Sequence, residues 1–503
     1  MLYDIIFVTG EIYFDHPLSG TAMLKRWLEK HNFKVGIIEK PAKREEVTKL
    51  GKPKLFFGVT SGAIDSMVRN YTPLKKLRIN DKNLKYNEEV PDRAVSVYSN
   101  WIKQNFKDAK IVLGGTEASL RRFTHYDYWE NRLRKPLLFD TKTDIIAYGS
   151  AEKQILEIAN KIKKGESLEG IEGTCIISKT APETFKILPS YDDVVKDKSK
   201  FVEMQNGLTN YRNLAQKIDN RYLLQYKSPI YTSKDLDEYY GLPFTRKVNS
   251  PHLNGFEFSM VTHRGCYGDC SFCSLKLMQG SKVVSRSEES ILSEIKHITK
   301  MKHFKGNIDD LGGPSVNMYG TDCNKCEKSC IDCKQLNRTN EKLIQLLQKA
   351  RKIPGVKKVY VRSGIRYDMA TPEYVKELLT YHTSGTIKIA PEHITPKVLK
   401  LMNKDKGDLD NFIKIAGDKN LTYYFMLCHP GASIKEDKEL ADKVKTLKNN
   451  QHIQLFTPTP MTDSTCMYYT GLDINMKKIH VTYTYKDKKI QKNLTMKKTN
   501  LIK

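Results

Sequence analysis

Long apolar runs are missing from this 503-residue sequence. No stretch of roughly 18 or more consecutive apolar residues occurs, so the chain offers no candidate for a membrane-spanning helix. No basic segment followed by an apolar one precedes Asp4, so we expect no secretory leader. Both absences favour a cytoplasmic protein without a membrane partner.

Cysteine is scarce outside two short groups. The sequence has 10 cysteines, and seven of them fall in groups with ligand-like spacing, while Cys175, Cys428 and Cys466 stand alone. This distribution indicates metal ligation in a reducing compartment and not a disulfide scaffold.

Acidic residues are also few. Against 84 Lys and Arg there are 58 Asp and Glu, which gives a formal charge of +26. Such a balance suits a nucleic-acid partner, and RNA is kept as a candidate. The positive residues are mostly lysines spread over predicted helix faces and the C-terminal tail, and general lysine richness explains them equally well.

The first cysteine group, Cys266-x3-Cys270-x2-Cys273, follows an apolar-leaning segment at residues 256–262. A protein-held 4Fe–4S cluster takes four cysteines, so a loop with three leaves one iron open, as a catalytic metal site requires. Two glycines in this loop allow the tight backbone that wraps a cluster. The alternative is a three-thiolate zinc site completed by His263.

The second cysteine group consists of two Cys-x2-Cys pairs separated by three residues. Four soft ligands within so short a segment can close around one zinc ion or a second iron–sulfur cluster. The alternative is a surface loop with reduced thiols. The tentative ligands of this second site are Cys323, Cys326, Cys330 and Cys333.

Short apolar segments alternate with amphipathic helical segments after residue 256. This alternation predicts βα units and a parallel sheet, whose ligands gather at the carboxyl ends of the strands. The predicted strands are residues 256–262, 307–311, 356–362, 386–390, 423–428 and 453–458.

The N-terminal third reads as a separate, doubly wound α/β domain. The expected division is a Rossmann-like domain at residues 1–185, a polar, helix-prone connector at 186–250 and a barrel at 251–472. The barrel carries a Cys-rich insertion at 321–336, and a basic tail follows at 473–503.

The Cys-x3-Cys-x2-Cys loop, with Phe272 just before its third cysteine, resembles the signature of radical S-adenosylmethionine (SAM) enzymes. The resemblance implies a partial (β/α)6 barrel in which the open iron chelates the amino and carboxylate groups of SAM. An electron from the cluster then cleaves SAM and yields a 5′-deoxyadenosyl radical. It further implies that the main chain around Phe272 contacts the adenine, and that a flavodoxin- or ferredoxin-like protein supplies the electron.

Residues at the other strand ends take implied roles from the same resemblance. Gly312-Gly313 resembles the Gly-Gly-Glu motif whose backbone receives the SAM amino group, although proline replaces the acid that follows. Glu392 stands where relatives bond the ribose hydroxyls. Ser363 and Arg366 are candidates for holding the ribose or carboxylate. The alternative for each is a loop residue without a ligand.

The N-terminal domain resembles the cobalamin-binding type that precedes many radical SAM barrels. We do not expect bound cobalamin, because Asp15-His16-Pro-Leu-Ser-Gly20 shifts the spacing of the cobalt-ligating Asp-x-His-x-x-Gly motif. The predicted fold class is therefore α/β, with a doubly wound, cobalamin-binding-like domain followed by a partial (β/α)6 radical SAM barrel.

Several short segments together resemble the YgiQ-type family of uncharacterised radical SAM proteins, and the resemblance extends through Gly471. The implied function is reductive cleavage of SAM with an unknown substrate. The alternative is a non-catalytic iron–sulfur protein for electron transfer or redox-sensing RNA binding. The segments are 9–11, 15–17, 310–314, 390–393 and 457–471.

Overall fold

The computed structural model describes residues 2–78, 90–247, 255–323, 330–449 and 451–496. Contacts within the chain divide it into two compact units. Unit 1 comprises Met1–Ile230, Leu242–His252 and Thr457–Met476, and unit 2 comprises Tyr231–Gly241, Leu253–Phe456 and Lys477–Lys503. This division differs from the expected one, because most of the predicted connector and residues 457–472 belong to unit 1.

Unit 1 contains a nine-stranded sheet and the helices along it. Its elements are β1 (Ile5–Thr9), α1 (Gly20–Lys30), β2 (Val35–Glu39), η1 (Arg44–Thr48), β3 (Phe56–Thr60), α2 (Ser66–Asn70), α3 (Ala94–Asn105), β4 (Ile111–Leu113), α4 (Gly115–Leu120), β5 (His125–Asp127), β6 (Arg132–Arg134), α5 (Leu137–Thr141), β7 (Ile145–Ala147), α6 (Glu152–Lys164), β8 (Thr174–Ser178), β9 (Lys186–Leu188), α7 (Tyr191–Lys196), α8 (Lys198–Gly207), β10 (Leu214–Ile218), β11 (Arg221–Gln225) and α17 (Asp463–Thr470).

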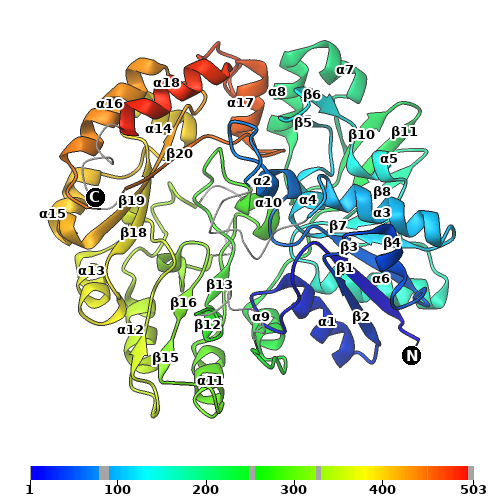
Figure 1. Cartoon of the computed structure of the whole chain (residues 1–503), viewed down its shortest axis with the longest axis horizontal. Helices are drawn as coiled ribbons and strands as arrows, with labels where there is room; N and C mark the ends of the chain where they lie inside the picture. Colours follow the sequence, from blue (N-terminus) through cyan, green and yellow to red (C-terminus); the bar gives the residue numbers. More distant parts are fainter. Residues whose placement is uncertain (1, 79–89, 248–254, 324–329, 450, 497–503) are drawn as a thin grey trace. The chain divides into compact units, whose positions relative to one another are not determined.

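The strand order of this sheet is β2-β1-β3-β4-β7-β8-β11-β10-β9. Strands β2, β1, β3, β4 and β7 are mutually parallel, and β1 is buried along its whole length, as a sheet covered on both faces requires. Helices α1 and α6 contact each other, and α3 contacts α5 and η1 (Figure 1). The doubly wound pattern predicted for this region is present.

The sheet extends into the predicted connector. Strands β9, β10 and β11 lie within residues 186–250, which the sequence marked as polar and helix-prone. Two buried glutamines explain the difference, because both are satisfied inside the unit. The Gln225 amide oxygen accepts from Arg122 Nε at 2.8 Å, and the Gln216 amide oxygen accepts from Thr124 N at 3.1 Å. Tertiary pairing therefore overrides local composition here.

Unit 2 contains the Cys266 loop and a series of βα units. Its elements are α9 (Ser233–Tyr240), β12 (Ser259–Val261), β13 (His263–Arg264), α10 (Leu275–Gln279), β14 (Val284–Ser285), α11 (Glu288–Ile298), β15 (Asn307–Ile308), β16 (Asp310–Gly312), η4 (Val316–Met318), α12 (Glu341–Ala350), β17 (Lys358–Val359), η5 (Tyr367–Met369), α13 (Pro372–Glu377), η6 (Leu378–His382), β18 (Ile387–Glu392), α14 (Pro396–Met402), α15 (Leu409–Ala416), η7 (Asp418–Asn420), β19 (Leu421–Leu427), α16 (Ile434–Thr446), β20 (Gln451–Leu455) and α18 (Tyr485–Met496).

Most strands of unit 2 pair in parallel, and the exception is the short antiparallel pair of β13 and β14. Strand β12 pairs with β16, β15 pairs with β17, and β18, β19 and β20 pair in succession. A parallel bridge between Ile365 and Ile389 links the segment after β17 to β18. Each predicted strand segment coincides with one of these strands, and their carboxyl ends carry the predicted site residues.

The predicted basic tail is helical over α18, which contacts α16 and β20. Lys488 and Gln491 of this helix are buried. The Cys428 thiol donates to the Gln491 amide oxygen at 2.7 Å. This part of the tail therefore belongs to the fold of unit 2.

Candidate active site

The Cys266 loop begins at a backbone position that only glycine can occupy. Gly265 has φ +83°, and a Cβ added there would lie 1.8 Å from the Lys282 carbonyl oxygen. The next residue, Cys266, donates its N–H to the Gly280 carbonyl at 3.1 Å. These contacts fix the direction in which the chain enters the loop.

The three loop thiols are free and partly exposed. Burial raises the pKa of Cys266, and burial together with the neighbouring thiols raises the pKa of Cys273 to about 12. Thiolates at these positions therefore need a positive partner, which bound iron supplies.

The zinc alternative for this loop requires a fourth ligand close to the three thiols. Within the described ranges, no group of three or more His, Cys, Asp or Glu side chains lies close enough together to hold one metal ion. His263, the candidate fourth zinc ligand, is fully buried, and its Nδ1 lies 2.9 Å from Thr262 Oγ1. Its Nε2 has no hydrogen-bond partner within the described residues, so the preference for a cubane over a zinc tetrahedron rests on the spacing of the three cysteines.

Gly312 and Gly313 end strand β16 in close contact with neighbouring groups. The Gly312 carbonyl accepts from Thr262 N at 2.8 Å and from Thr262 Oγ1 at 3.0 Å. A Cβ added at Gly313 would lie 2.3 Å from the His263 ring. The backbone of this turn therefore lies so close to Thr262 and His263 that no side chain fits between them.

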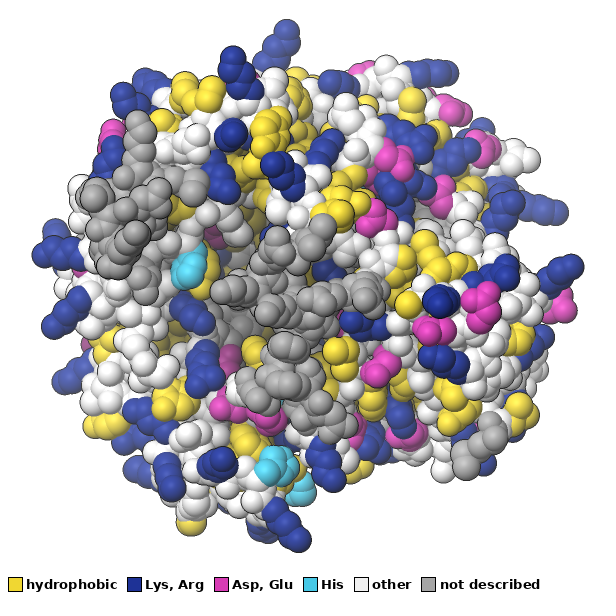
Figure 2. Space-filling view, in the orientation of Figure 1, with side chains coloured by type: hydrophobic (Ala, Val, Ile, Leu, Met, Phe, Trp, Pro, Cys, Tyr) yellow, Lys and Arg dark blue, Asp and Glu magenta, His cyan; other side chains and the backbone are white. Residues whose placement is uncertain are grey.

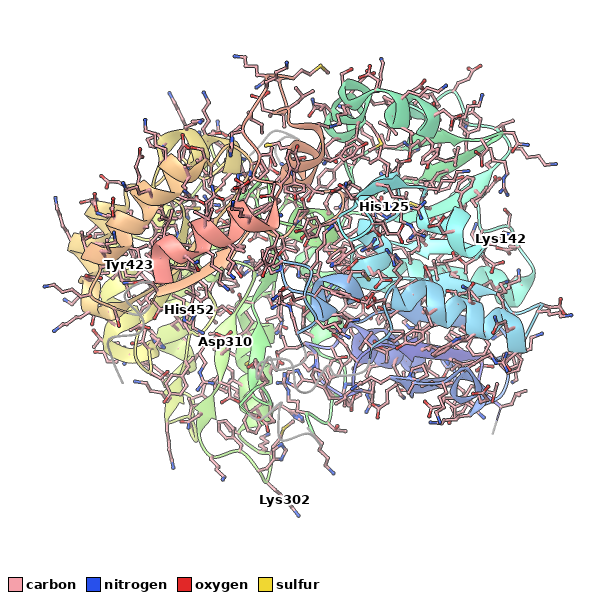
Figure 3. The ribbon with its side chains drawn as sticks, turned by 45° about the horizontal axis from the view of Figure 1, so that its top comes forward. His125, Lys142, Lys302, Asp310, Tyr423 and His452 are labelled. Carbon is pink, nitrogen blue, oxygen red and sulfur yellow. The ribbon has the colours of Figure 1, made fainter. Side chains whose placement is uncertain are left out.

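Ser363 is committed to a partner that the sequence did not reveal. Its hydroxyl donates to Asp310 Oδ2 at 2.5 Å, and Asp310 Oδ1 accepts from the backbone of Arg362 at 2.7 Å and of Ser363 at 3.2 Å. Figure 3 labels Asp310 on its strand. Asp310, the first residue of β16, thus ties this strand to the residues that follow β17, and its signal in the sequence was an acid inside a predicted strand.

Glu392 is the most unusual carboxylate of unit 2. It is 8% exposed, its φ is +67°, and its Oε2 has no hydrogen-bond partner within the described residues. Burial raises its pKa, and Lys404 lowers it to a lesser extent. A buried, unpartnered oxygen on a strained backbone at a strand end is a characteristic of a ligand site.

Phe272 lies near a buried histidine of the barrel. The ring centroids of Phe272 and His429 are 6.3 Å apart, and His429 lies 5.3 Å from Phe456. Burial, followed by the effect of His393, lowers the pKa of His429 to about 3, so this imidazole is neutral. The aromatic residue of the Cys loop therefore borders an apolar wall.

His393, the residue after Glu392, has a structural role. Its Nδ1 accepts from Thr395 N at 3.1 Å, which places the proton on Nε2, 3.4 Å from the buried Asp437 carboxylate. The second Asp437 oxygen accepts from Cys428 N at 3.0 Å. Both nitrogens of His393 are therefore occupied.

The described part of the second cysteine group contacts the first. Cys330 and Ile331 belong to an apolar cluster with Tyr267 of the Cys266 loop, and Cys266 and Cys333 contact this cluster. Lys282 Nζ lies 3.8 Å from Cys330 Sγ. Cys323 is partly exposed, and Cys326 lies outside the described residues.

The shifted Asp-His segment of unit 1 is engaged by protein groups. Asp15 accepts from Arg26 Nε at 2.9 Å and from Thr245 N at 3.0 Å. His16 is fully buried, with Nδ1 3.1 Å from Leu18 N and Nε2 3.1 Å from Arg246 Nη1. Both ring nitrogens face protein donors, so His16 does not fit a cobalt ligand.

Family models match both units. A Radical SAM N-terminal model matches residues 2–257, and a Radical SAM superfamily model matches residues 260–444. A UPF0313 protein of Methanocaldococcus jannaschii is 44% identical over 98% of this chain and 89% of its own length. A UPF0313 protein of Fusobacterium nucleatum is 41% identical over 98% of this chain and 96% of its own length. The chain belongs to the UPF0313 family of radical SAM proteins.

Solved structures show the same fold at low sequence identity. The radical SAM methyltransferase TsrM of Kitasatospora setae superposes with TM-score 0.55 at 13% identity, covering 91% of this chain and 74% of TsrM. The cobalamin-dependent SAM radical enzyme OxsB superposes with TM-score 0.53 at 15% identity, covering 90% of this chain and 53% of OxsB.

The predicted fold class and enzyme class are therefore confirmed: this UPF0313 member is a radical SAM enzyme of unspecified reaction, and its class implies a 4Fe–4S cluster and SAM. None of the helices in the described ranges is both long and apolar enough to cross a bilayer.

Proposed function

We propose that Cys266, Cys270 and Cys273 hold three irons of a 4Fe–4S cluster whose open iron binds SAM for reductive cleavage. When bound, this cluster supplies the electron for that cleavage. The observation that carries the proposal is the buried Glu392, whose Oε2 has no hydrogen-bond partner within the described ranges, in the unit whose strand β12 precedes the three-cysteine loop. A buried acid with a purely structural role is expected to have hydrogen-bond partners for both carboxylate oxygens.

The chain's own residues bind and orient SAM in this proposal. The Gly312-Gly313 backbone receives the amino group, Glu392 accepts from the ribose hydroxyls, and the main chain around Phe272 borders the adenine. Ser363 acts indirectly, because its hydroxyl is donated to Asp310 and stabilises the strand end beside Gly312. The buried surroundings of Glu392 strengthen each hydrogen bond made there.

Anaerobic reconstitution followed by a SAM-cleavage assay tests the proposal. The reduced, iron-loaded protein is expected to release methionine and 5′-deoxyadenosine. A protein that holds iron and accepts electrons but neither binds nor cleaves SAM would be the alternative, a non-catalytic iron–sulfur protein. The electron donor proposed is a flavodoxin- or ferredoxin-like protein, since the reaction consumes one electron.

The four cysteines of the insertion form a second, separable metal site in this proposal, as zinc or an iron–sulfur cluster. Support comes from their spacing and from the placement of Cys330 and Cys333 against the Cys266 loop. The variant with Cys323, Cys326, Cys330 and Cys333 all changed to Ala is expected to lose this metal and keep the first cluster's iron. Unchanged iron and zinc per chain would identify the four as free thiols.

Cobalamin is not part of the proposed function, because the His16 nitrogens and the Asp15 carboxylate are engaged by protein donors. After incubation with aquacobalamin and gel filtration, the protein fraction should show no visible absorbance from cobalamin. RNA remains a candidate substrate on net charge. Figure 2 shows Lys and Arg side chains scattered over the visible face among acidic and uncharged ones, so their placement adds no support.

A further inference from the structure

We infer that Arg366 is a positioning residue of the Cys266 loop, whose charge, balanced by Asp368, sets how readily a bound cluster accepts an electron. The inference rests on the proposed function, because it needs a cluster on the three cysteines. It differs from the role expected from sequence, in which Arg366 holds the ribose or carboxylate of SAM.

The guanidinium of Arg366 lies against the loop. Its Nη1 is 3.8 Å from Cys270 Sγ, and the residue is 7% exposed. Gly268 makes this approach possible, because a Cβ added there would lie 2.3 Å from the same Nη1. The glycine between the first two cysteines therefore makes room for a cation, in addition to allowing a tight turn.

Both ends of Arg366 are held. Its Nε and Nη2 donate to the two Asp368 oxygens at 3.0 and 2.6 Å, a bidentate pair. Its backbone N donates to Asn317 Oδ1 at 2.9 Å, and Asn317 Nδ2 donates back to its carbonyl at 2.8 Å. Two guanidinium nitrogens are thus occupied by Asp368, and Nη1 faces the loop sulfur.

The electrostatic consequence has a definite sign. Reduction adds one negative charge to a cluster that already carries thiolates, and a cation nearby favours that state. Removing the Arg366 charge should therefore lower the midpoint potential. Removing the Asp368 charge should raise it, because the guanidinium then acts without its counter-charge.

The experiment compares Arg366→Gln, Arg366→Lys and Asp368→Asn in the reconstituted full-length protein by anaerobic redox titration with electron paramagnetic resonance. At a fixed potential, Arg366→Gln is expected to lower the ratio of reduced to oxidised cluster about tenfold or more, and tenfold equals about 59 mV for one electron. Asp368→Asn should move the ratio in the opposite direction, and Arg366→Lys should stay closer to the parent.

A matched pair of controls lies on the helical side of the same barrel. Arg351 Nε is 3.6 Å from Glu377 Oε1, and among the described residues neither side chain is hydrogen-bonded to a loop cysteine. Arg351→Gln and Glu377→Gln make the same charge changes and should leave the potential unchanged. A shift in these controls as large as that of Arg366→Gln would overturn the inference.

Iron content, measured first, separates this inference from the proposed function. If the parent protein binds no iron, the proposed function itself is wrong. If Arg366→Gln keeps iron and potential but loses SAM affinity, Arg366 is a SAM ligand and the inference is wrong. If Arg366→Gln does not bind iron, the midpoint potentials of Arg366→Lys and Asp368→Asn test the inference instead. An unchanged midpoint potential in Asp368→Asn would then overturn the inference.

Discussion

Each unit has a buried acid near the carboxyl end of a strand, and the two acids differ in whether their oxygens have hydrogen-bond partners. In unit 1, Asp65 accepts from Met67 N at 3.0 Å and forms an ion pair with the buried Arg121, whose Nε lies 2.8 Å from Asp65 Oδ2. In unit 2, Glu392 is also buried, but its Oε2 has no hydrogen-bond partner among the residues that the structure describes. Asp65 stabilises the fold, whereas a buried polar atom without a partner costs free energy, which is why we propose Glu392 as a ligand-binding residue.

Other acids of unit 1 follow the pattern of Asp65. The buried Glu117 accepts from Ser66 N at 3.0 Å and from Val95 N at 3.1 Å, so it caps two helices. Glu11, after β1, accepts from Ala63 N at 2.6 Å and from Arg69 at 3.3 Å. Asp65, Glu117 and Glu11 are therefore acids with protein hydrogen-bond donors near the carboxyl ends of this sheet, where a doubly wound fold binds its ligand.

The largest expected effect is on the cluster itself. Changing Cys266, Cys270 and Cys273 together to Ala should remove a cubane's worth of iron and abolish SAM cleavage, because no thiolate of the loop remains. Iron analysis after anaerobic reconstitution measures this. Cys466→Ser, an isolated cysteine of unit 1, is the matched control and should retain iron. Full iron retention in the triple variant would show that the cluster is held elsewhere.

The second effect tests the satisfied side of the comparison. Asp65→Ala leaves the buried Arg121 guanidinium without its main counter-charge and should destabilise unit 1 by about 3–5 kcal/mol. All 3 tryptophans, at positions 27, 101 and 129, lie in unit 1, so tryptophan fluorescence during urea unfolding reports this unit. Asp219→Ala breaks an exposed pair with Lys135 and should change little. Equal effects of the two substitutions would contradict the distinction.

The third effect tests the unsatisfied side. Glu392→Ala should weaken SAM binding by about 1–3 kcal/mol, because charge-assisted hydrogen bonds to the ribose are lost. Equilibrium binding to the iron-loaded, unreduced protein measures it. Glu373→Ala, an exposed acid in α13, serves as control. Unchanged affinity in Glu392→Ala would exclude this residue from the site.

The smallest effect concerns pH. Burial raises the folded-state pKa of Glu392 above its ordinary value of 4.5, so the native state binds this proton more tightly and the residue becomes destabilising as pH rises through 4.5 and the raised pKa. Glu392→Gln should therefore stabilise unit 2 at pH 7, by under about 2 kcal/mol, and the gain should vanish below pH 4.5. Hydrogen exchange in β18 and β19 measures it, and a gain that persists in acid would point to another cause.

The candidate site residues could be named from the sequence because their signals are local. The spacing of the three cysteines and the position of Glu392 at the end of an apolar segment are properties of short stretches. The partners of Ser363 and Arg366 were missed. Asp310 lies 53 residues before Ser363 in the chain, and Asn317 lies 49 before Arg366, so only the folded chain brings them together. Asp368 is close in sequence, but a nearby acid alone does not identify an ion pair.

The fold was predictable to the same extent and for the same reason. The βα series of unit 2 follows from apolar periodicity, and each predicted segment overlaps a parallel strand, whereas the short antiparallel strands β13 and β14 were not predicted. Strands β10 and β11 were missed because Gln216 and Gln225 read as polar, solvent-facing positions. Their amide groups are paired with Thr124 and Arg122, which are distant in sequence.

Unit 1 is built from chain segments that are synthesised at different times. Gln205 donates to the Met461 carbonyl at 3.0 Å and to Asp463 at 2.8 Å, within a segment made after nearly all of unit 2. At typical translation rates the ribosome needs roughly 10–50 s to travel from the first part of unit 1 to that segment. During that interval unit 1 lacks the segment Thr457–Met476, which is still to be synthesised, whereas the cysteine loop has already been made. Residues 266–273 are therefore synthesised before the last segment of unit 1.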